Sequence, residues 1–174
     1  VAMRGANIDM KIGMAYHIML SSVKLCYNKF NADHAVFCLE GRSWRKDFYE
    51  PYKKNRQVAR MAKSVREQEE DQIMFQSYDD MITFLGEKTN VTMLRNPEAE
   101  ADDMIALFIA AHPNDNHIIV SSDSDYFQLI TDNVTMYDGV QNRIITKDGF
   151  FKDDKNMTPL KEKKTGEIKE KVDP

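Results

Sequence analysis

The sequence predicts an α/β fold in which helices flank a mainly parallel central sheet. Short apolar runs that suit buried strands alternate with longer segments in which apolar residues recur at helical spacing. The chain has 174 residues, of which 42% are hydrophobic, so it is long enough to bury a core. Its two cysteines, Cys26 and Cys38, lie in apolar stretches and match no metal-ligand spacing, which argues against a disulfide scaffold.

The first half of the chain supplies two predicted helices and two predicted strands. Helical spacing of apolar residues predicts a helix over 9–28, and the continuous apolar run 35–39 is typical of a strand buried on both faces. Helical spacing returns over roughly 63–86, where Gly86 is expected to end the helix. Residues 91–94 form the next predicted strand.

The second half continues the alternation. A helix is expected to start at Asn96 and the following proline and to stop near Pro113, and its acidic first turn suits the positive end of the helix dipole. Two further strands are predicted at 117–121 and 134–137, with a short helix at 126–130 between them. Strands and helices that alternate at this spacing indicate parallel pairing within one sheet.

We expect one domain over residues 1–151, followed by a different kind of segment. Residues 152–174 carry seven lysines, six acids and few apolar residues, so they are predicted to form an exposed loop or tail. No apolar run approaches the ~20 residues that a membrane span needs. We also find no charged-then-apolar leader, and with the free cysteines this predicts a cytoplasmic protein.

The formal net charge of −4 conceals an uneven distribution of charge. Residues 40–66 contain nine basic and three acidic side chains, whereas residues 98–125 contain seven acids and no lysine or arginine. The net charge argues against a generally basic nucleic-acid binder, but the asymmetry between the two segments points to a function. Two solvated faces of opposite sign are the alternative interpretation.

Three groups of acids fall at or near the predicted strand ends. They are Glu40 after the strand 35–39, Asp123 and Asp125 after the strand 117–121, and Glu100, Asp102 and Asp103 in the first turns of the helix after 91–94. Open parallel sheets bind ligands at this edge, and packed carboxylates need a countercharge. Oxygen ligands favour Mg²⁺ or Mn²⁺, and two such ions suit displacement at a phosphodiester. First-turn and capping roles are the alternative for each single acid.

Aromatic and basic side chains are interleaved in residues 40–66. The aromatic ones are Trp44, Phe48, Tyr49 and Tyr52, and the basic ones nearest to them are Arg42, Arg45, Lys46, Lys53, Lys54 and Arg56. Cations neutralise phosphates, and aromatic rings stack on unpaired bases. We therefore expect a basic flap or arch that closes over the acidic site, with an ordinary surface loop as the alternative.

Three ordered motifs resemble those of the 5′-nuclease or flap endonuclease family, a PIN-like family. Residues 98–106 resemble its Glu-Ala-Asp-Asp signature, and residues 119–129 resemble its apolar strand followed by Asp-x-Asp. Residues 51–56 resemble its Tyr-Lys-x-Asn-Arg element at the base of a helical arch. Members of the family include phage 5′→3′ exonucleases and the 5′-nuclease domain of bacterial DNA polymerase I.

The resemblance implies roles for individual residues. The implied ligands of divalent metals are Glu100, Asp102, Asp103, Asp123 and Asp125, with Glu40 where the family usually has Asp. Lys53 and Arg56 would contact the scissile phosphate or a threaded 5′ strand, beside Tyr52 and the basic Arg42, Arg45, Lys46 and Lys54. The family's first acidic strand and its Gly-Asp-x-x-Asp-Asn motif, which leads into a helix-hairpin-helix, are not found. We therefore expect a portion of a longer nuclease.

The expected function is that of a magnesium-dependent, structure-specific 5′ nuclease with two metal ions. Its expected substrates are branched DNA with a 5′ end or flap, or RNA primers in RNA–DNA hybrids, during replication in a bacterium or a phage-infected cell. Replication proteins are expected partners. Two alternatives stay open: a catalytically silent nucleic-acid-binding module on the same scaffold, and a PIN-type ribonuclease that cleaves single-stranded RNA.

Overall fold

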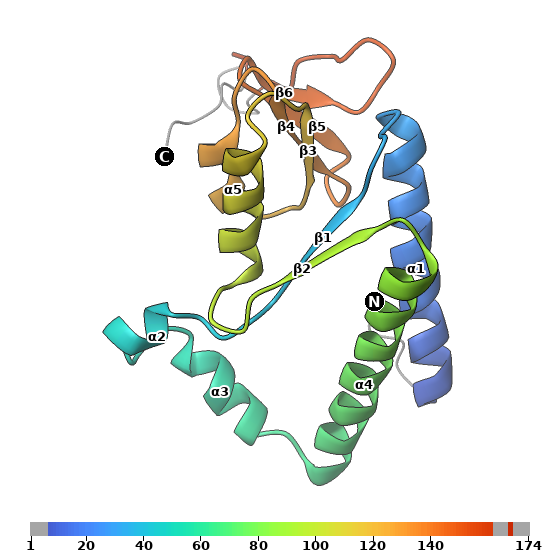
Figure 1. Cartoon of the computed structure of the whole chain (residues 1–174), viewed down its shortest axis with the longest axis vertical. Coiled ribbons are helices and arrows are strands. Elements are labelled where there is room, and N and C mark those ends of the chain that lie inside the picture. Colours follow the sequence, from blue (N-terminus) through green and yellow to red (C-terminus); the bar gives the residue numbers. More distant parts are fainter. Residues whose placement is uncertain (1–6, 162–166, 169–174) are drawn as a thin grey trace. The chain divides into compact units, whose positions relative to one another are not determined.

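A computed structural model of the chain describes residues 7–161 and 167–168. The chain divides into two compact units, residues 1–104 and 105–174. Both units contain helices and strands, so the predicted α/β class is confirmed (Figure 1). No helix in the described part of the chain is long and apolar enough to cross a membrane.

Two long helices lie side by side in the first unit (Figure 1): α1 (Ile8–Lys29) and α4 (Val65–Lys88). The side chain of Asn7 caps α1 by accepting a 2.9 Å hydrogen bond from the third residue of the helix. The two helices are joined by polar contacts, because the Tyr16 hydroxyl donates to the Ser77 carbonyl oxygen over 2.5 Å. Helix α1 confirms the predicted helix over 9–28 to within a residue at each end.

Helix α4 starts at a capping box and buries one stripe of its surface. The Ser64 side chain accepts a hydrogen bond from the backbone of Glu67, whose own side chain accepts one from the backbone of Ser64. Met81, Ile82 and Leu85 are buried at the other end of the helix. Burial of these three side chains stabilises the end of the helix, which contacts the strand that follows it.

The predicted helix end at Gly86 is wrong. Helix α4 continues through Lys88 and is closed at Thr89, whose backbone N–H donates to the Leu85 carbonyl oxygen over 3.1 Å. Gly86 serves packing instead, because a Cβ atom added there would lie 3.3 Å from Cγ of Met93. The glycine lets the helix approach the next strand closely.

Strands β1 (Val36–Leu39) and β2 (Thr92–Arg95) form a two-stranded parallel sheet. Leu39 is the partner of Arg95, so the two strands end at the same level. The loops that leave both strands therefore start from one edge. As expected, Glu40 after β1 and the acids that follow β2 therefore lie on loops that leave the same edge of this sheet.

The basic segment between β1 and α4 folds into two short helices that its sequence did not predict. They are α2 (Arg45–Phe48) and α3 (Lys54–Met61). Helix α2 is a single turn, and α3 has only eight residues of mostly polar sequence, so both are too short for a helical period to be recognised from the sequence. The expected closure of this segment as an arch stays a prediction.

Helix α5 (Ala101–Ala111) starts later than predicted. The Asn96 side chain accepts a 2.8 Å hydrogen bond from the Glu98 backbone, and the Ala99 N–H donates to the Asn96 carbonyl oxygen over 3.4 Å. This local turn competes with helix formation, as Asn side chains often do. The helix begins only after the turn has closed.

The second unit contains a four-stranded sheet in the order β3-β4-β5-β6. Its strands are β3 (His117–Val120), β4 (Val134–Asp138), β5 (Arg143–Thr146) and β6 (Gly149–Lys152). Strands β3 and β4 pair in parallel, whereas β4, β5 and β6 pair antiparallel. The sequence predicted β3 and β4 within one central sheet, but it missed the β5–β6 hairpin and the division of the strands between two sheets.

The core of the second unit consists of seven buried side chains: Ile119, Tyr126, Ile130, Val134, Met136, Ile145 and Phe150. Ile105 and Ile109 of α5 pack against it. A short 3₁₀ helix, η1 (Ser124–Leu129), connects β3 towards β4 and buries Tyr126 in the core. The predicted short helix at 126–130 is therefore confirmed in place, with a tighter backbone.

The first part of the predicted tail is ordered against β6. The Lys152 N–H donates to the Thr158 carbonyl oxygen, and the Leu160 N–H donates to the Phe150 carbonyl oxygen, both over 2.8 Å. Leu160 also packs on the core. Residues 154–159 are exposed, as expected for this segment, but a return turn pairs part of it with the sheet. Residues 162–166 and 169–174 lie outside the described residues.

A buried ion pair closes the turn between β4 and β5. Asp138 is 0% exposed and accepts 3.0 Å hydrogen bonds from Nε of Arg143 and from the backbones of Val140 and Gln141. The guanidinium of Arg143 also lies 5.2 Å from the centre of the Phe150 ring. The Asp138 carboxylate is therefore the shared hydrogen-bond acceptor of Arg143 and of two backbone N–H groups in this turn.

We predict that Asp138→Ala lowers the free energy of unfolding by about 3–5 kcal/mol, because it leaves the buried Arg143 charge unpaired. Urea denaturation followed by circular dichroism measures the change. Asp132→Ala is the matched control, since Asp132 pairs with Lys147 on the exposed surface and its loss should leave stability unchanged. Equal effects of the two variants would contradict the role of Asp138.

Candidate functional site

Two strand-end loops are joined by backbone hydrogen bonds at the carboxyl edge of the β1–β2 sheet. The Gly41 N–H donates to the Ala99 carbonyl oxygen over 3.0 Å, and the Arg42 N–H donates to that of Pro97 over 2.8 Å. The Glu40 carboxylate accepts a 3.4 Å hydrogen bond from the backbone of Ala101, the first residue of α5. The loops therefore bring Glu40 to the start of the acidic helix.

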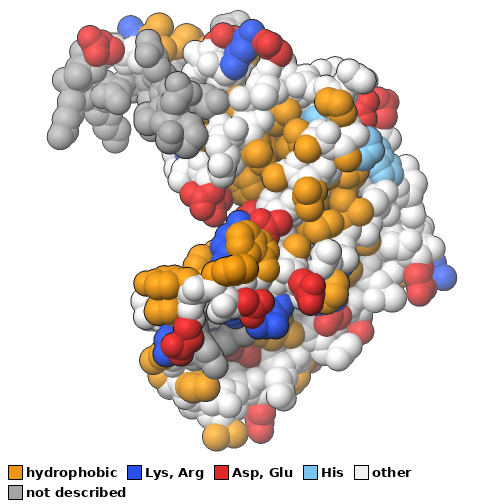
Figure 2. Space-filling view, turned by 60° about the vertical axis from the view of Figure 1, so that its left-hand side comes forward, with side chains coloured by type: hydrophobic (Ala, Val, Ile, Leu, Met, Phe, Trp, Pro, Cys, Tyr) orange, Lys and Arg blue, Asp and Glu red, His pale blue; other side chains and the backbone are white. Residues whose placement is uncertain are grey.

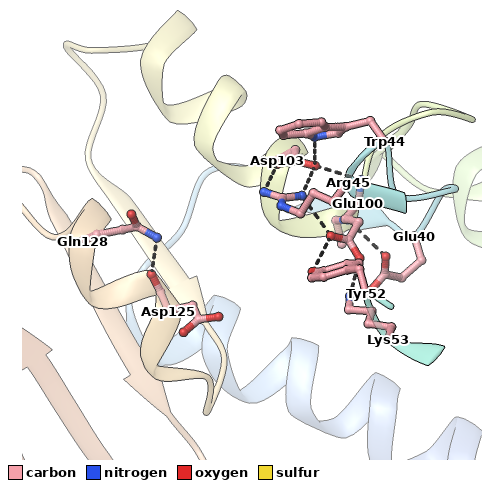
Figure 3. Close-up of polar contacts among 10 residues, drawn as sticks. Glu40, Trp44, Arg45, Tyr52, Lys53, Glu100, Asp103, Asp125 and Gln128 are labelled. Atoms are coloured by element: carbon pink, nitrogen blue, oxygen red, sulfur yellow. Dashed lines mark hydrogen bonds and ion pairs between the residues drawn. The ribbon is translucent and has the colours of Figure 1, made fainter. Parts of the chain in front are cut away.

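Glu100 is the buried centre of the site and is only 3% exposed. Its carboxylate accepts hydrogen bonds from Nη1 of Arg45 over 2.9 Å and from the Tyr52 hydroxyl over 3.0 Å. Nζ of Lys53 forms an ion pair with its other oxygen. Figure 3 shows these side chains converging on Glu100 from the basic segment, with Glu40 beside them. A buried carboxylate is stable only with such partners.

Asp103 shares its main partner with Glu100. Nη1 and Nη2 of Arg45 donate to the two oxygens of Asp103 over 3.0 and 2.8 Å, a bidentate arrangement. The Trp44 indole N–H and the Glu100 backbone N–H donate to the same carboxylate over 3.2 and 3.1 Å. The Arg45 guanidinium also lies 4.8 Å from the centre of the Trp44 ring. Arg45 thus links the two acids to α2.

The electrostatics of the cluster favour fully charged side chains. Burial alone would raise the pKa of the Glu100 carboxyl, but the hydrogen bonds and charge of Lys53 and Tyr52 outweigh burial and lower this pKa. The hydrogen bond from Arg45 lowers the pKa of the Asp103 carboxyl and raises the pKa of Arg45 itself. Opposite charges therefore hold one another in the ionised state.

Lys53 occupies an unusual backbone conformation. Its φ angle is 56°, in the left-handed region that residues other than glycine rarely adopt. The conformation directly precedes α3 and directs the ammonium group to Glu100. Burial opposes charge on Lys53, yet the carboxylates of Glu100 and Glu40 raise its pKa. Strain at a charged residue of this kind is typical of functional sites.

The surface of α2 carries exposed aromatic rings. Trp44, Phe48 and Tyr49 are exposed, and the rings of Trp44 and Phe48 are in edge-to-face contact at 5.8 Å. Figure 2 shows hydrophobic side chains beside basic and acidic ones on the part of the surface that this segment forms. The arrangement suits stacking with unpaired bases.

The remaining basic residues predicted for the site are distributed around α2 and α3. Arg42 pairs with Asp47, Lys54 pairs with Glu50 over 2.8 Å, and Lys46 is exposed. The backbone of Arg56 lies in α3, and its side chain is outside the described residues. Arg45 and Lys53 are thus the basic side chains of this segment that contact Glu100 or Asp103 in the described structure, together with the aromatic Trp44 and Tyr52.

Asp123 and Asp125 lie in the second unit, directly after β3. Asp123 is the N-cap of η1, and its carboxylate accepts a 3.1 Å hydrogen bond from the Asp125 backbone. Gln128 donates to the Asp125 carbonyl oxygen over 2.8 Å (Figure 3). Both acidic side chains are exposed. The capping alternative therefore applies to Asp123, and the metal-ligand roles of both acids stay predictions.

The structure brings together one part of the predicted metal set. Glu40, Glu100 and Asp103 lie within one cluster, and Asp102 lies on the first turn of the same helix. Their oxygen atoms suit Mg²⁺ or Mn²⁺ chemically. Across residues 7–161 and 167–168, however, no three His, Cys, Asp or Glu side chains are placed to hold a metal ion. The described arrangement does not fit a preformed metal site, because the chain's own cations contact Glu100 and Asp103.

Ser43 is a residue of the cluster that the sequence analysis missed. It is 4% exposed, and its hydroxyl oxygen has no hydrogen-bond partner among the described residues, although it lies beside Glu100. Nothing in its sequence position distinguishes it from a surface serine. Only the joined loops at Gly41 place it inside the site.

Comparison with known proteins identifies the fold and the family. Residues 6–156 match the family model described as 5′-3′ exonuclease, N-terminal resolvase-like domain. The chain belongs to this family. The match includes all of the strand-end acids and the basic segment.

Individual relatives agree with this assignment. The chain is 27% identical over 145 residues to the flap endonuclease Xni of Pseudoalteromonas translucida, covering 80% of this chain and 48% of the relative. The D15 protein of phage T5, co-crystallised with metal ions, has a TM-score of 0.63 and 23% identity over 71% of this chain and 47% of that chain.

A second T5 structure is the 5′-exonuclease with bound zinc ions, at a TM-score of 0.62 and 22% identity over 73% of this chain and 48% of that chain. A third is the T5 D15 flap endonuclease in a pseudo-enzyme-product complex with DNA and metal ions. It has a TM-score of 0.60 and 23% identity, and the match covers 71% of this chain and 46% of that chain. At these identities the structures show a shared fold. The chain spans about half the length of the relatives it matches.

We predict that Gly41→Ala destabilises the first unit by about 1–3 kcal/mol, because the new Cβ would lie 2.0 Å from the Asn96 carbonyl oxygen and force the loops apart. Gly13→Ala is the control, since a Cβ there meets nothing within 4 Å and the helix should gain about 0.5–1 kcal/mol. Urea denaturation compares them. Wild-type stability of Gly41→Ala would rule out the close approach of the loops.

The lowered pKa of Asp103 predicts an acid-sensitive contribution to stability. A carboxyl whose pKa is lower in the folded state stabilises the fold above its unfolded pKa of about 3.9, and this contribution is lost as the pH falls through the folded pKa. The stability difference between wild type and Asp103→Asn should therefore be largest above about pH 4 and shrink below it. Asp33→Asn, in an exposed loop, is the control. A difference that does not change with pH would contradict the Arg45–Asp103 pairing.

Proposed function

We propose that the chain carries the catalytic region of a magnesium-dependent, structure-specific 5′ nuclease that hydrolyses phosphodiesters. The observation that supports this most directly is the cluster in which a basic, aromatic segment contacts strand-end carboxylates, in a chain of the 5′-3′ exonuclease family. Carboxylates and phosphate-binding cations at one sheet edge are the two components that such hydrolysis requires.

The proposed metal ligands are Glu40, Glu100, Asp102, Asp103, Asp123 and Asp125. Their oxygen donors favour Mg²⁺ or Mn²⁺, and two ions are proposed by analogy with the metal-bound T5 relatives. When bound, divalent ions at such a site supply an activated water and stabilise the leaving oxygen. The chain's own contribution is to position the carboxylates and the cations around them.

The basic segment is proposed to hold the substrate. Lys53 and Arg56 would contact the phosphate at the cleavage point, and the ammonium of Lys53 would stabilise charge that develops on it. Tyr52 and the exposed rings of α2 would pack against unpaired bases. Arg42, Arg45, Lys46 and Lys54 would neutralise neighbouring phosphates.

The proposed substrates are DNA with a 5′ end or flap and the RNA strand of RNA–DNA hybrids. The DNA complex of the T5 relative and the flap endonuclease named among the curated relatives support DNA as the first choice. Removal of primers during phage or bacterial replication, in the cytoplasm and beside replication proteins, is the cellular role that this chemistry would serve.

A catalytically silent nucleic-acid-binding module is the second candidate. The observation that favours it is that Arg45 and Lys53 occupy the carboxylates of Glu100 and Asp103, with no three potential ligands converging among the described residues. Such a module would bind flap DNA without magnesium-dependent cleavage. The two candidates therefore differ in one measurable property.

The deciding experiment uses 5′-flap DNA, an RNA–DNA hybrid and single-stranded RNA, each with and without Mg²⁺. Cleavage that needs both Mg²⁺ and a 5′ end supports the proposed nuclease. Binding without cleavage supports the silent module, and cleavage of single-stranded RNA without a 5′ end supports a PIN-type ribonuclease. Gel electrophoresis of labelled substrates separates the three outcomes.

We predict that Asp123→Asn with Asp125→Asn lowers magnesium-dependent cleavage by at least about a hundredfold, because the amides bind divalent ions far less well than carboxylates. Asp115→Asn with Asp148→Asn, two exposed acids of the same unit, should retain wild-type turnover. Unchanged turnover in the first double variant would contradict the proposed role of both acids.

A further inference from the structure

Trp44 is an exposed ring that the fold holds in one place. It is 45% exposed, yet its indole N–H donates to the Asp103 carboxylate over 3.2 Å. The Arg45 guanidinium lies 4.8 Å from the centre of the ring, and the Phe48 ring meets it edge to face at 5.8 Å. Figure 3 shows the indole beside Asp103 and Arg45. Three contacts of different kinds therefore orient a ring that remains open to solvent.

Neither helix capping nor burial explains a tryptophan at this position. Trp44 directly precedes α2, where Ser, Thr, Asp and Asn are preferred because their side chains cap the helix. The Trp44 side chain makes no capping hydrogen bond, and the neighbouring Phe48 and Tyr49 are 84% and 63% exposed. Adjacent exposed rings leave apolar surface in water at a cost in free energy. A patch of this kind is typical of a binding surface.

The surroundings of the three rings favour a nucleic acid over a protein as the ligand. Arg42, Lys46 and Lys54 are exposed on the same segment. Lysine is depleted in the cores of protein–protein interfaces, whereas rings beside cations are typical of surfaces that bind single strands. The cations contact phosphates, and the rings stack on bases. Bases within a duplex already stack on their neighbours, so the open ring suits an unpaired base.

We propose that Trp44 stacks on one unpaired base of the substrate and that Arg45 is the positioning residue that holds the ring for this contact. The inference deepens the proposed function and rests on it, because the base belongs to its nucleic-acid substrate. It assigns base and phosphate to different side chains. The base contacts Trp44, with Phe48 at the edge of the ring, and the phosphates contact the exposed cations of the segment.

Arg45 is suited to position the ring. Its two Nη atoms donate to the two oxygens of Asp103, and Nη1 also donates to Glu100, which fixes the plane of the guanidinium. A lysine has the same charge but a compact ammonium group, which neither forms the bidentate contact nor offers a flat face to the indole. Arg45→Lys should therefore keep the charge and release the ring.

The test compares two 5′-flap DNAs that have the same phosphates. One flap carries adenine bases, and the other consists of abasic nucleotides. Fluorescence anisotropy of labelled DNA measures binding in EDTA, so that no cleavage occurs. The wild type should bind the adenine flap roughly tenfold more tightly than the abasic flap, which is the effect expected of one stacked base.

Variants then assign this ratio of affinities to the ring. Trp44→Leu should bring the ratio close to one, and Trp44→Phe, which keeps a ring but lacks the indole N–H, should retain part of it. Arg45→Lys should lower the ratio, and because the charge is kept, the fall reports the ring and not the attraction to phosphates. Phe84→Leu is the matched control, since Phe84 is an exposed ring on α4, and its ratio should equal that of the wild type. Circular dichroism establishes that each variant is folded.

A second readout needs no variant. Trp44 is the only tryptophan of the chain, so the intrinsic fluorescence reports on this ring alone. Saturation with the adenine flap should quench the fluorescence of the wild type, because the base stacks on the indole. Saturation with the abasic flap should leave most of it unchanged.

Equal affinity of the wild type for the two flaps, equal quenching by both, or an unchanged ratio in folded Trp44→Leu would overturn the inference. Failure of the wild type to bind either flap would overturn it as well and would favour a protein as the ligand of the rings. The cleavage assay with Mg²⁺ is independent of these measurements. Base-dependent binding without cleavage would support the role of Trp44 and refute the nuclease, whereas cleavage with equal affinities would do the reverse.

Discussion

The buried carboxylate of Glu100 is the constraint on which the site depends. A charge at this depth requires partners, and the chain provides them from Arg45, Tyr52 and Lys53 on a segment about fifty residues earlier. These contacts stabilise the single turn of α2 and the left-handed backbone conformation of Lys53. Neither element has enough apolar surface to fold by its own burial. The electrostatic demand of one acid thus organises a segment of mostly polar residues.

The same interaction explains why a basic segment and an acidic segment can coexist in a chain of modest net charge. The joined loops at Gly41 bring the end of β1 to the start of α5, where the two segments meet. Opposite charges then lower the pKa values of Glu100 and Asp103 instead of exposing two highly charged faces to solvent. The charge asymmetry therefore reflects a contact within the fold as well as the surface that is proposed to bind nucleic acid.

Much of this fold could be predicted from sequence, and the exceptions have physical causes. The period of apolar residues indicated α1, α4 and the strands β1 to β4, because these elements bury one face or both. It did not indicate the short helices α2, whose Arg45 pairs with Glu100 and Asp103, and α3, or the end of α4, where Gly86 packs on Met93. The motifs identified Glu100 and Asp103, but the contact of Arg45 with both acids, and the burial of Ser43, depend on tertiary structure.

The return of residues 153–161 along β6 affects where this chain can be shortened. The Phe150 carbonyl oxygen accepts from the Leu160 backbone, and Leu160 covers part of the core. A chain ending at Lys152 would present a bare sheet edge with unpaired carbonyl groups and exposed apolar side chains. Such edges pair with those of other molecules and lead to aggregation. Soluble expression of the second unit therefore depends on a segment whose composition resembles that of a dispensable linker.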